Sequence, residues 1–331
     1  MQEFIQGAAL PIVVFLLVVG FFLLVKGADF FVEGSSSIAK RLRVPSIIIG
    51  LTIVAMGTSL PETAVSVTAS MVNNNALAVS NVIGSNIFNL MFVIGVCSIL
   101  TPIAVQRDTI VRDIPLSVCC AVLLAVLGIL AIGDKTSYIL GHLDGGIFLV
   151  LFAGYMIVMI RSAMKARSEG KVVMTEDTEE RKVLSYPKSI LCIVGGASAI
   201  ALGGDLTVDT ASRIAVELGM SQTLVGLTIV SIGTSLPELV TSFVAAKKNE
   251  VDMAVGNAVG SNVFNILMVL GIASAIHPIS LLRENLVDIL ILILFSVMVW
   301  FFAATQKKIE RKEGLIMAGV YLLYAVYIVL R

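Results

Sequence analysis

Residues 63–106 form a run of 44 residues without a single Asp, Glu, Lys or Arg. An ordinary soluble domain carries about 25% charged residues, whereas this chain of 331 residues has 14%, with 57% hydrophobic residues. This composition excludes a disordered protein, a nucleic-acid binder with a basic face and most soluble enzymes. Because helices satisfy their own backbone hydrogen bonds in lipid, the apolar runs predict an all-α polytopic membrane protein.

Charged and turn-forming residues divide the chain into segments that are each long enough to cross a bilayer at about 20 residues. The first apolar run, residues 4–25, is free of charge and follows no basic residue, so we expect a membrane span there and not a cleaved signal. The sequence predicts ten transmembrane helices, near residues 8–34, 44–71, 76–100, 112–132, 145–161, 188–212, 220–246, 252–276, 285–305 and 314–330.

Basic residues are distributed unevenly between the two sides that these helices define. The loops after the first, third, fifth, seventh and ninth helices hold 18 Lys and Arg, and the opposite side with both termini holds four. Loops rich in Lys and Arg remain in the cytoplasm. We therefore expect an integral protein of the cell membrane (plasma or inner), with both termini extracellular or periplasmic and residues 162–187 as a solvated cytoplasmic linker.

The chain contains an internal repeat at an offset of 176 residues. Residues 50–62, GLTIVAMGTSLPE, recur as residues 226–238, GLTIVSIGTSLPE, with 11 of 13 positions identical, and GSNIFN at 84–89 recurs as GSNVFN at 260–265. Each half holds five predicted spans, an odd number, so the second half enters the membrane from the opposite side, as in many secondary transporters. The predicted repeats are residues 1–161 and 188–331, with repeat motifs over about 44–100 and 220–276.

Two glutamates, Glu62 and Glu238, lie at equivalent positions deep inside apolar segments. A carboxylate at the bilayer centre costs roughly 2.5–3.5 kcal/mol or more, which indicates a functional role. Pro61 and Pro237 remove a backbone donor and predict a break in each helix. The hydroxyls of one helical turn lie on the same face as each glutamate; they belong to Thr58, Ser59, Thr234 and Ser235.

The third and eighth predicted helices add amide and hydroxyl groups with a spacing of four residues, on one helix face. These side chains are Ser85 with Asn89, and Ser261 with Asn265. Together the motifs offer carboxylate, hydroxyl, amide and carbonyl oxygens without His or Cys. Such a set favours a hard cation such as Na⁺, Ca²⁺ or Mg²⁺ over zinc or copper.

The paired GTSLPE and GSNxFN segments resemble the two repeats of the cation/calcium exchanger superfamily, most closely its sodium/calcium exchangers of the prokaryotic type without a regulatory domain. The resemblance implies the sodium/calcium exchanger fold, ten helices in two inverted five-helix repeats, and Na⁺ and Ca²⁺ competing for sites between the repeat motifs. It implies that Glu62 and Glu238 bind both ions and that the carbonyls of Ala55 and Ser231 contribute. The remaining implied ligands are Thr58, Ser59, Thr234, Ser235, Ser85, Ser261, Asn89 and Asn265.

One position departs from the family pattern. Many members have an aspartate where this chain has Asn265, so its site holds two acidic groups and not three. Since that aspartate is associated with a K⁺ requirement in the potassium-dependent branch, we expect no K⁺ dependence here. No cofactor, nucleic acid or obligate protein partner is indicated; the predicted partners are the transported Na⁺ and Ca²⁺ and the lipid bilayer.

We expect an antiporter that works by alternating access, in which the first and sixth helices slide against the other eight. Four acids on these two helices, Asp29, Glu33, Asp205 and Asp209, are expected to form structural pairs, for instance with Lys26. A cation/proton antiporter of the same fold is the alternative, although the abundant Thr and Ser oxygens favour Na⁺. An intramembrane enzyme would be expected to place two aspartates within reach of one shared proton, so we predict no enzymatic activity.

Overall fold

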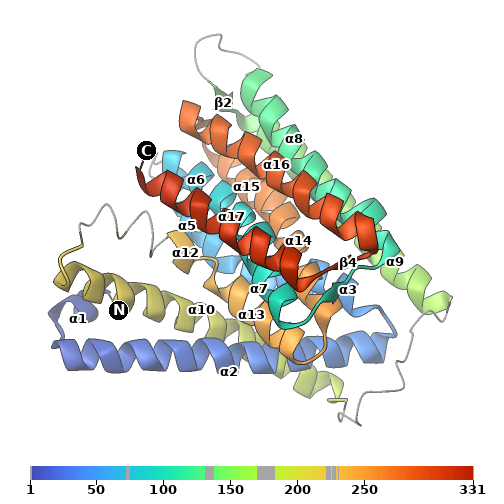
Figure 1. Cartoon of the computed structure of the whole chain (residues 1–331), viewed down its shortest axis with the longest axis horizontal. Coiled ribbons are helices and arrows are strands. Elements are labelled where there is room, and N and C mark those ends of the chain that lie inside the picture. The colour runs from blue at the N-terminus through green and yellow to red at the C-terminus, as the bar shows by residue number, and fades with distance from the viewer. Residues whose placement is uncertain are drawn as a thin grey trace.

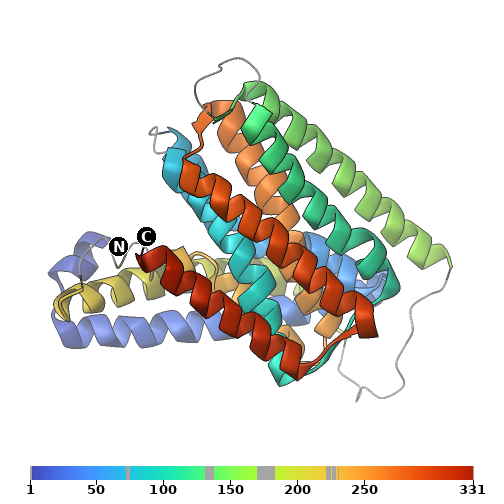
Figure 2. The same ribbon diagram turned by 45° about the horizontal axis from the view of Figure 1, so that its top comes forward.

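The computed structural model describes residues 2–71, 75–130, 138–169, 183–220, 225, 229 and 231–330. Its helices form two groups that differ in direction (Figure 1). The long α2 (Leu10–Leu42) and α10 (Tyr186–Glu217) lie side by side. The remaining long helices cross this pair at a steep angle, which a second view shows as well (Figure 2).

The first 113 residues of the chain contain eleven described helical segments and strands. After the short α1 (Gln2–Gly7) and α2 they are α3 (Ser46–Ile49), η1 (Gly50–Val54), α4 (Ala55–Thr58), α5 (Leu60–Met71), α6 (Asn75–Ile87), η2 (Phe88–Val93), α7 (Ile94–Leu100), β1 (Ile103–Ala104) and η3 (Thr109–Asp113). The prefix η marks π-helix, in which one backbone bond spans five residues instead of four. The predicted second and third spans are therefore each a chain of α- and π-helical pieces.

The rest of the chain follows the same pattern. Its elements are α8 (Ile114–Leu130), β2 (Ile139–Leu140), α9 (His142–Ser168), α10, α12 (Ser231–Gly233), α13 (Leu236–Lys247), α14 (Val251–Phe264), η5 (Asn265–Val269), α15 (Leu270–Ile276), β3 (Ile279–Ser280), α16 (Arg283–Gln306), β4 (Lys308–Ile309) and α17 (Arg311–Leu330). The π-segments η2 and η5 lie at nearly equivalent positions of the two halves.

Within the described residues, eight helices are long and apolar enough to cross a membrane. A ninth span is a pair, Ser46–Thr58 and Leu60–Met71, bent by 49°. The predicted span over 220–246 falls partly outside the described residues, and its described part includes α12 and α13. All predicted spans with described residues are helical, and the multi-pass membrane fold is confirmed.

Two predicted boundaries are wrong in the same way. The first helix was expected to end at residue 34 and the fifth at 161, but α2 continues to Leu42 and α9 to Ser168. Both extensions contain basic residues in the last turn, Lys40 and Arg41 in α2 and Lys165 and Arg167 in α9. Positive charge stabilises the C-terminal end of a helix, so part of each basic segment is helix and not loop.

Small residues allow α2 and α10 to cross closely. A Cβ added to Gly20 would lie 3.2 Å from the carbonyl oxygen of Gly203, and one added to Gly27 would lie 2.9 Å from that of Gly196. A Cβ on Gly34 would lie 2.7 Å from the carbonyl oxygen of Ser189. Since the contact positions rise on one helix as they fall on the other, the two helices are antiparallel. Backbone contact of this kind is typical of small residues at membrane helix interfaces.

The four strands of the described chain are two residues long and join loops in pairs. β1 pairs antiparallel with β4, and β2 pairs antiparallel with β3. Each pair connects two loops that the Lys and Arg count assigns to the same side of the membrane. The loops on each side are thus tied together without changing the all-α class.

Polar and apolar side chains are arranged opposite to those of a soluble protein. α14 contains twelve buried residues, from Met253 to Phe264, among them the polar Asn257, Ser261 and Asn262. Large apolar side chains such as Phe15, Phe22 and Leu191 are exposed on the outer helices. This arrangement is that of a protein whose outer surface contacts lipid and whose polar groups face one another in the interior.

Candidate ion-binding site

Both glutamate-bearing helices break immediately before the glutamate. Ser59 has φ −84° and ψ 12°, and Ser235 has φ −93° and ψ 4°, values outside the α-helical region. α5 and α13 restart directly after these serines, with Glu62 and Glu238 in their first turns. A helix N-terminus carries a partial positive charge that stabilises a nearby carboxylate. The breaks predicted from the prolines are therefore present, and they place the glutamates at helix ends inside the molecule.

The two halves of the chain exchange hydrogen bonds at these breaks. The Ser59 hydroxyl donates to Glu238 Oε1 at 2.8 Å, and the Ser235 hydroxyl donates to Glu62 Oε1 at 3.2 Å. Ser235 Oγ also lies 2.8 Å from Ser85 Oγ, and the Ser261 hydroxyl lies 3.4 Å from Glu238 Oε1. Both carboxylates are 0% exposed. Each glutamate thus lies against the helix break of the other half.

Several side-chain oxygens of the site have no hydrogen-bond donor among the described residues. They are Oε2 of Glu62, Oε2 of Glu238 and Oδ1 of Asn89, Asn262 and Asn265. A buried carboxylate without a positive partner is costly, and none of the described ion pairs includes Glu62 or Glu238. Carboxylate and amide oxygens with free lone pairs suit a hard cation such as Na⁺ or Ca²⁺.

Two asparagines behind the glutamates, Asn81 and Asn257, contact the threonines of the breaks. The Thr58 hydroxyl donates to Asn257 Oδ1 at 3.0 Å, and the Thr234 hydroxyl donates to Asn81 Oδ1 at 3.1 Å. The Asn257 amide donates to the Glu238 carbonyl at 3.3 Å and to Ser242 Oγ at 2.9 Å. The Asn81 amide donates in the same way to Glu62 and Ser66, at 3.5 and 3.0 Å. Because both amide hydrogens are used, the oxygen of each asparagine faces its threonine.

Another pair of asparagines, Asn86 and Asn262, joins the α6 and α14 helices at the pseudo-twofold axis. Asn86 donates to the carbonyl of Asn262 at 3.3 Å, and Asn262 donates to the carbonyl of Asn86 at 3.1 Å. The symmetry then ends, because Asn265 donates to Asn86 Oδ1 at 3.2 Å while neither amide atom of Asn89 has a partner among the described residues. Asn89 and Asn265 both lie in or beside π-segments, which are frequent at functional sites.

The structure brings the hydroxyls of Ser59, Ser85, Ser235 and Ser261 together with the two glutamates around the breaks. The other predicted side chains, Thr58, Thr234, Asn89 and Asn265, are buried as well. Asn265 contacts Asn86, and no described hydrogen bond joins Asn89 to either glutamate. The Ala55 carbonyl accepts the Ser59 amide at 3.1 Å and lies 3.4 Å from the Thr58 hydroxyl. Ser231 begins α12, and its side chain lies outside the described residues.

The sequence interpretation did not assign a role to the supporting asparagines and serines. Asn81 with Asn257, Asn86 with Asn262, and Ser66 with Ser242 are pairs at the offset of 176 residues. A search for every polar residue repeated at that offset would have found them. Tyr155, whose hydroxyl donates to the Leu51 carbonyl, lies outside the repeat motifs, so the repeat offset gives no signal for it.

Among the four acids expected to form structural pairs, Asp29 forms ion pairs with lysines. Asp29 pairs with Lys248 at 3.2 Å and with Lys26 at 3.7 Å, which confirms a structural pairing for this acid. His142 and His277 contact loop or helix-end carbonyls and not the glutamates. All four cysteines are free. Within the described part of the chain, no three His, Cys, Asp or Glu side chains form a cluster for a metal such as zinc.

Comparison with known proteins assigns the chain to a family. The family model described as sodium/calcium exchanger protein matches residues 12–161 and 188–330. The chain belongs to the sodium/calcium exchanger family. This family consists of ion exchangers and not of enzymes, and the two matched segments leave out residues 162–187, which the sequence predicts as the linker.

Individual exchangers align over most of the chain. The putative antiporter CaxA of Alkalimonas amylolytica is 41% identical, over 78% of this chain and 79% of its own length. The sodium/calcium exchanger MaX1 of Methanosarcina acetivorans is 31% identical, over 94% and 97%. A solved structure of the sodium-calcium exchanger NCX_Mj, soaked with Na⁺ and Sr²⁺, superposes with a TM-score of 0.79 at 31% identity, over 95% of this chain and 98% of that one. The sodium/calcium exchanger fold that the family resemblance implies is therefore confirmed.

Proposed function

We propose that this chain is a secondary active antiporter that exchanges Na⁺ for Ca²⁺ by alternating access. The observation that carries the proposal is the reciprocal pair of hydrogen bonds, Ser59 to Glu238 and Ser235 to Glu62, which encloses two buried carboxylates between the halves of the molecule. The family and the names of the relatives, MaX1 and NCX_Mj among them, support the choice of Na⁺ and Ca²⁺.

In this proposal, Glu62 and Glu238 together neutralise one Ca²⁺, or they share several Na⁺ with neutral oxygens. Thr58, Ser59, Ser85 and the Ala55 carbonyl supply such oxygens in the first half. Thr234, Ser235, Ser261 and the Ser231 carbonyl do so in the second half, and Asn89 and Asn265 complete the set. Because both kinds of ion use the same carboxylates, the two occupancies exclude each other, which is what exchange requires.

The closely packed α2 and α10 are the elements that we propose to move. Backbone contacts at Gly20, Gly27 and Gly34 join them into one unit, and sliding of packed helices is a known form of conformational change. The remaining helices are joined across the halves by the reciprocal bonds of Asn86 and Asn262. Sliding of the pair would open the site to one side and then to the other, as expected for inverted repeats.

We further propose the orientation given by the Lys and Arg count, with both termini extracellular or periplasmic and residues 162–187 cytoplasmic. The division into two repeats, 1–161 and 188–331, and independence from K⁺ belong to the same proposal. The absence of a third carboxylate, with Asn265 in its place, supports the latter.

Flux driven by defined gradients separates this proposal from the cation/proton alternative. Purified protein in proteoliposomes is expected to accumulate ⁴⁵Ca²⁺ when Na⁺ is trapped inside and absent outside. A pH gradient of similar size without Na⁺ is expected to drive no uptake. Uptake that follows the pH gradient and ignores Na⁺ would instead establish the proton antiporter.

A further inference from the structure

A π-turn lies directly before the proposed ion ligands of the second span. η1 (Gly50–Val54) ends at Ala55, whose amide donates to the carbonyls of Gly50 and Thr52. In a regular α-helix the Ala55 amide would donate to Leu51, four residues earlier. The π-turn therefore takes the usual donor away from the Leu51 carbonyl.

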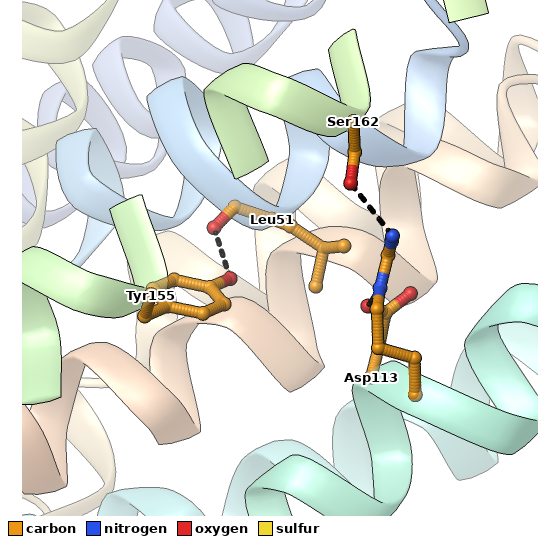
Figure 3. A network of polar contacts seen from close by, with 5 residues as sticks. Leu51, Asp113, Tyr155 and Ser162 are labelled. Carbon is orange, nitrogen blue, oxygen red and sulfur yellow. Dashed lines mark hydrogen bonds and ion pairs between the residues drawn. The ribbon is translucent and has the colours of Figure 1, made fainter. Parts of the chain in front are cut away.

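Tyr155 of α9 replaces that donor. Its phenol donates to the Leu51 carbonyl at 2.9 Å, and the side chain is 6% exposed. Figure 3 shows the Tyr155 hydroxyl directed at the Leu51 backbone from the neighbouring helix. Buried carbonyls and buried phenols both require hydrogen-bond partners, so this one bond satisfies two groups that would otherwise be unpaired in a membrane interior.

Two further contacts hold α9 at the position from which Tyr155 can reach Leu51. Seven residues later on the same face, the Ser162 hydroxyl accepts a bond from Arg112 Nη1 at 2.8 Å, and Asp113 fixes that guanidinium at 2.7 Å (Figure 3). Three residues before Tyr155, Phe152 meets Phe264 edge to face at 5.6 Å. The phenol is therefore presented by a helix that is anchored on both sides of it.

We infer that Tyr155 is a positioning residue for the ion site: its hydroxyl stabilises the π-turn that sets the direction of the Ala55 carbonyl and the Thr58 hydroxyl. A π-turn adds one residue, and each residue of an α-helix turns the chain by about 100°. Loss of the turn would thus rotate Ala55 and Thr58 relative to the residues before the turn, whereas Glu62 lies beyond the break at Ser59 and is held by Ser235. The expected effect on ion binding rests on the proposed function, whereas the stabilisation of the π-turn by Tyr155 does not.

The second half repeats the aromatic arrangement and assigns the equivalent place to Tyr324. Phe88 meets Tyr321 edge to face at 5.3 Å, as Phe264 meets Phe152, and Phe88 and Phe264 are related by the repeat offset. Tyr324 follows Tyr321 by three residues, as Tyr155 follows Phe152, and it is buried. Tyr321 therefore corresponds to a phenylalanine, which makes Tyr321→Phe a matched control.

The test compares Tyr155→Phe with wild type and with Tyr321→Phe, using the full-length protein purified in detergent. Stabilisation of the melting temperature by Na⁺ and by Ca²⁺ gives the half-saturating concentration of each ion. We expect Tyr155→Phe to raise the half-saturating Na⁺ concentration about five- to tenfold, the effect of one buried hydrogen bond. Ca²⁺, held chiefly by the carboxylates, is expected to change less than twofold, and Tyr321→Phe is expected to match wild type.

Hydrogen exchange over residues 50–58 provides a readout that needs no ion. We expect faster amide exchange there in Tyr155→Phe, without change in the distant α16 and α17. Should that variant give little folded protein, Ser162→Ala, which loosens the same helix, is expected to shift both readouts in the same direction by a smaller amount.

The inference is overturned if exchange over residues 50–58 is unchanged, or if Na⁺ and Ca²⁺ half-saturation move equally, since that would mean a general loss of stability. If wild type responds to neither ion, the proposed function fails. In that case the exchange rate over residues 50–58 still decides whether Tyr155 holds the π-turn.

Discussion

At the scale of single residues, the candidate site consists of two carboxylates and the hydroxyls next to them, and asparagine side chains hold the threonine hydroxyls in place. Glu62 and Glu238 are each contacted by a serine of the opposite half, and the threonines next to those serines are held by Asn81 and Asn257. Each asparagine donates with its amide group to its own half and accepts from a threonine of the other half. These bonds hold each threonine beside the helix break.

Replacing Asn257 tests this supporting layer. Asn257→Leu removes the acceptor of Thr58 and the donor to Glu238 and Ser242. The lost hydrogen bonding of about 2 kcal/mol is expected to lower the melting temperature by roughly 4 °C. Ser274→Ala, which removes a hydroxyl that donates to Leu270 of its own helix, serves as control and is expected to change the melting temperature by less than about 1 °C. Equal shifts for the two variants would contradict the supporting role of Asn257.

The meeting of the two buried glutamates with nearby hydroxyls could be predicted from the sequence, because a carboxylate between apolar residues has few explanations. The repeat offset added the equivalent depth of both glutamates and the hydroxyls one turn away. The supporting asparagines were not predicted, since an Asn inside a packed helix has no distinctive pattern until its partners are known. Tyr155 could not be predicted at all, because its partner is a backbone carbonyl on another helix.

At the scale of helices, the described parts of the spans are helical as predicted and the proline breaks are present, but the π-turns and two helix ends were not predicted. Charge and proline positions are sufficient to find an apolar segment and its break at Pro61 or Pro237. A π-turn such as η1 or η5 depends on which amide reaches which carbonyl, and this is decided by neighbouring helices. The ends of α2 and α9 were misjudged because basic residues occur both in cytoplasmic loops and in the last turn of helices.

The close crossing of α2 and α10 is testable with two adjacent glycines. A Cβ on Gly196 would lie 2.7 Å from the Gly27 carbonyl and the Phe31 amide, whereas a Cβ on Gly195 has nothing within 4 Å. Gly196→Val is therefore expected to separate the helices and to lower the free energy of unfolding by about 1–3 kcal/mol. Gly195→Val is expected to leave the melting temperature and the rate of Ca²⁺ flux near wild type.

Thermal unfolding in detergent and Ca²⁺ flux in proteoliposomes measure both effects for these glycine variants. A Gly196→Val protein with wild-type stability and flux would show that α2 and α10 are not held by this contact during exchange.

At the scale of the whole molecule, the proposed orientation rests on the basic residues of the loops and not on the site. Ser168 and Tyr138 are exposed and belong to loops or helix ends that the Lys and Arg count assigns to opposite sides. In a background in which the four cysteines are replaced by alanine, Ser168→Cys is expected to react with a membrane-impermeant maleimide only in inside-out vesicles. Tyr138→Cys is expected to react only in right-side-out vesicles, and the reverse pattern would invert the proposed orientation.

The central claim is that Na⁺ and Ca²⁺ exchange at a site formed by Glu62 and Glu238. Na⁺-gradient-driven ⁴⁵Ca²⁺ uptake into proteoliposomes tests it most directly, with Glu62→Gln, Glu238→Gln and the exposed Glu284→Gln compared with wild type. Each site variant keeps the shape of the side chain and removes the charge that neutralises Ca²⁺, so uptake is expected to fall at least a hundredfold in both, while Glu284→Gln retains it. Uptake that persists in either site variant, or a wild type that moves no Ca²⁺ in response to Na⁺, would contradict the account.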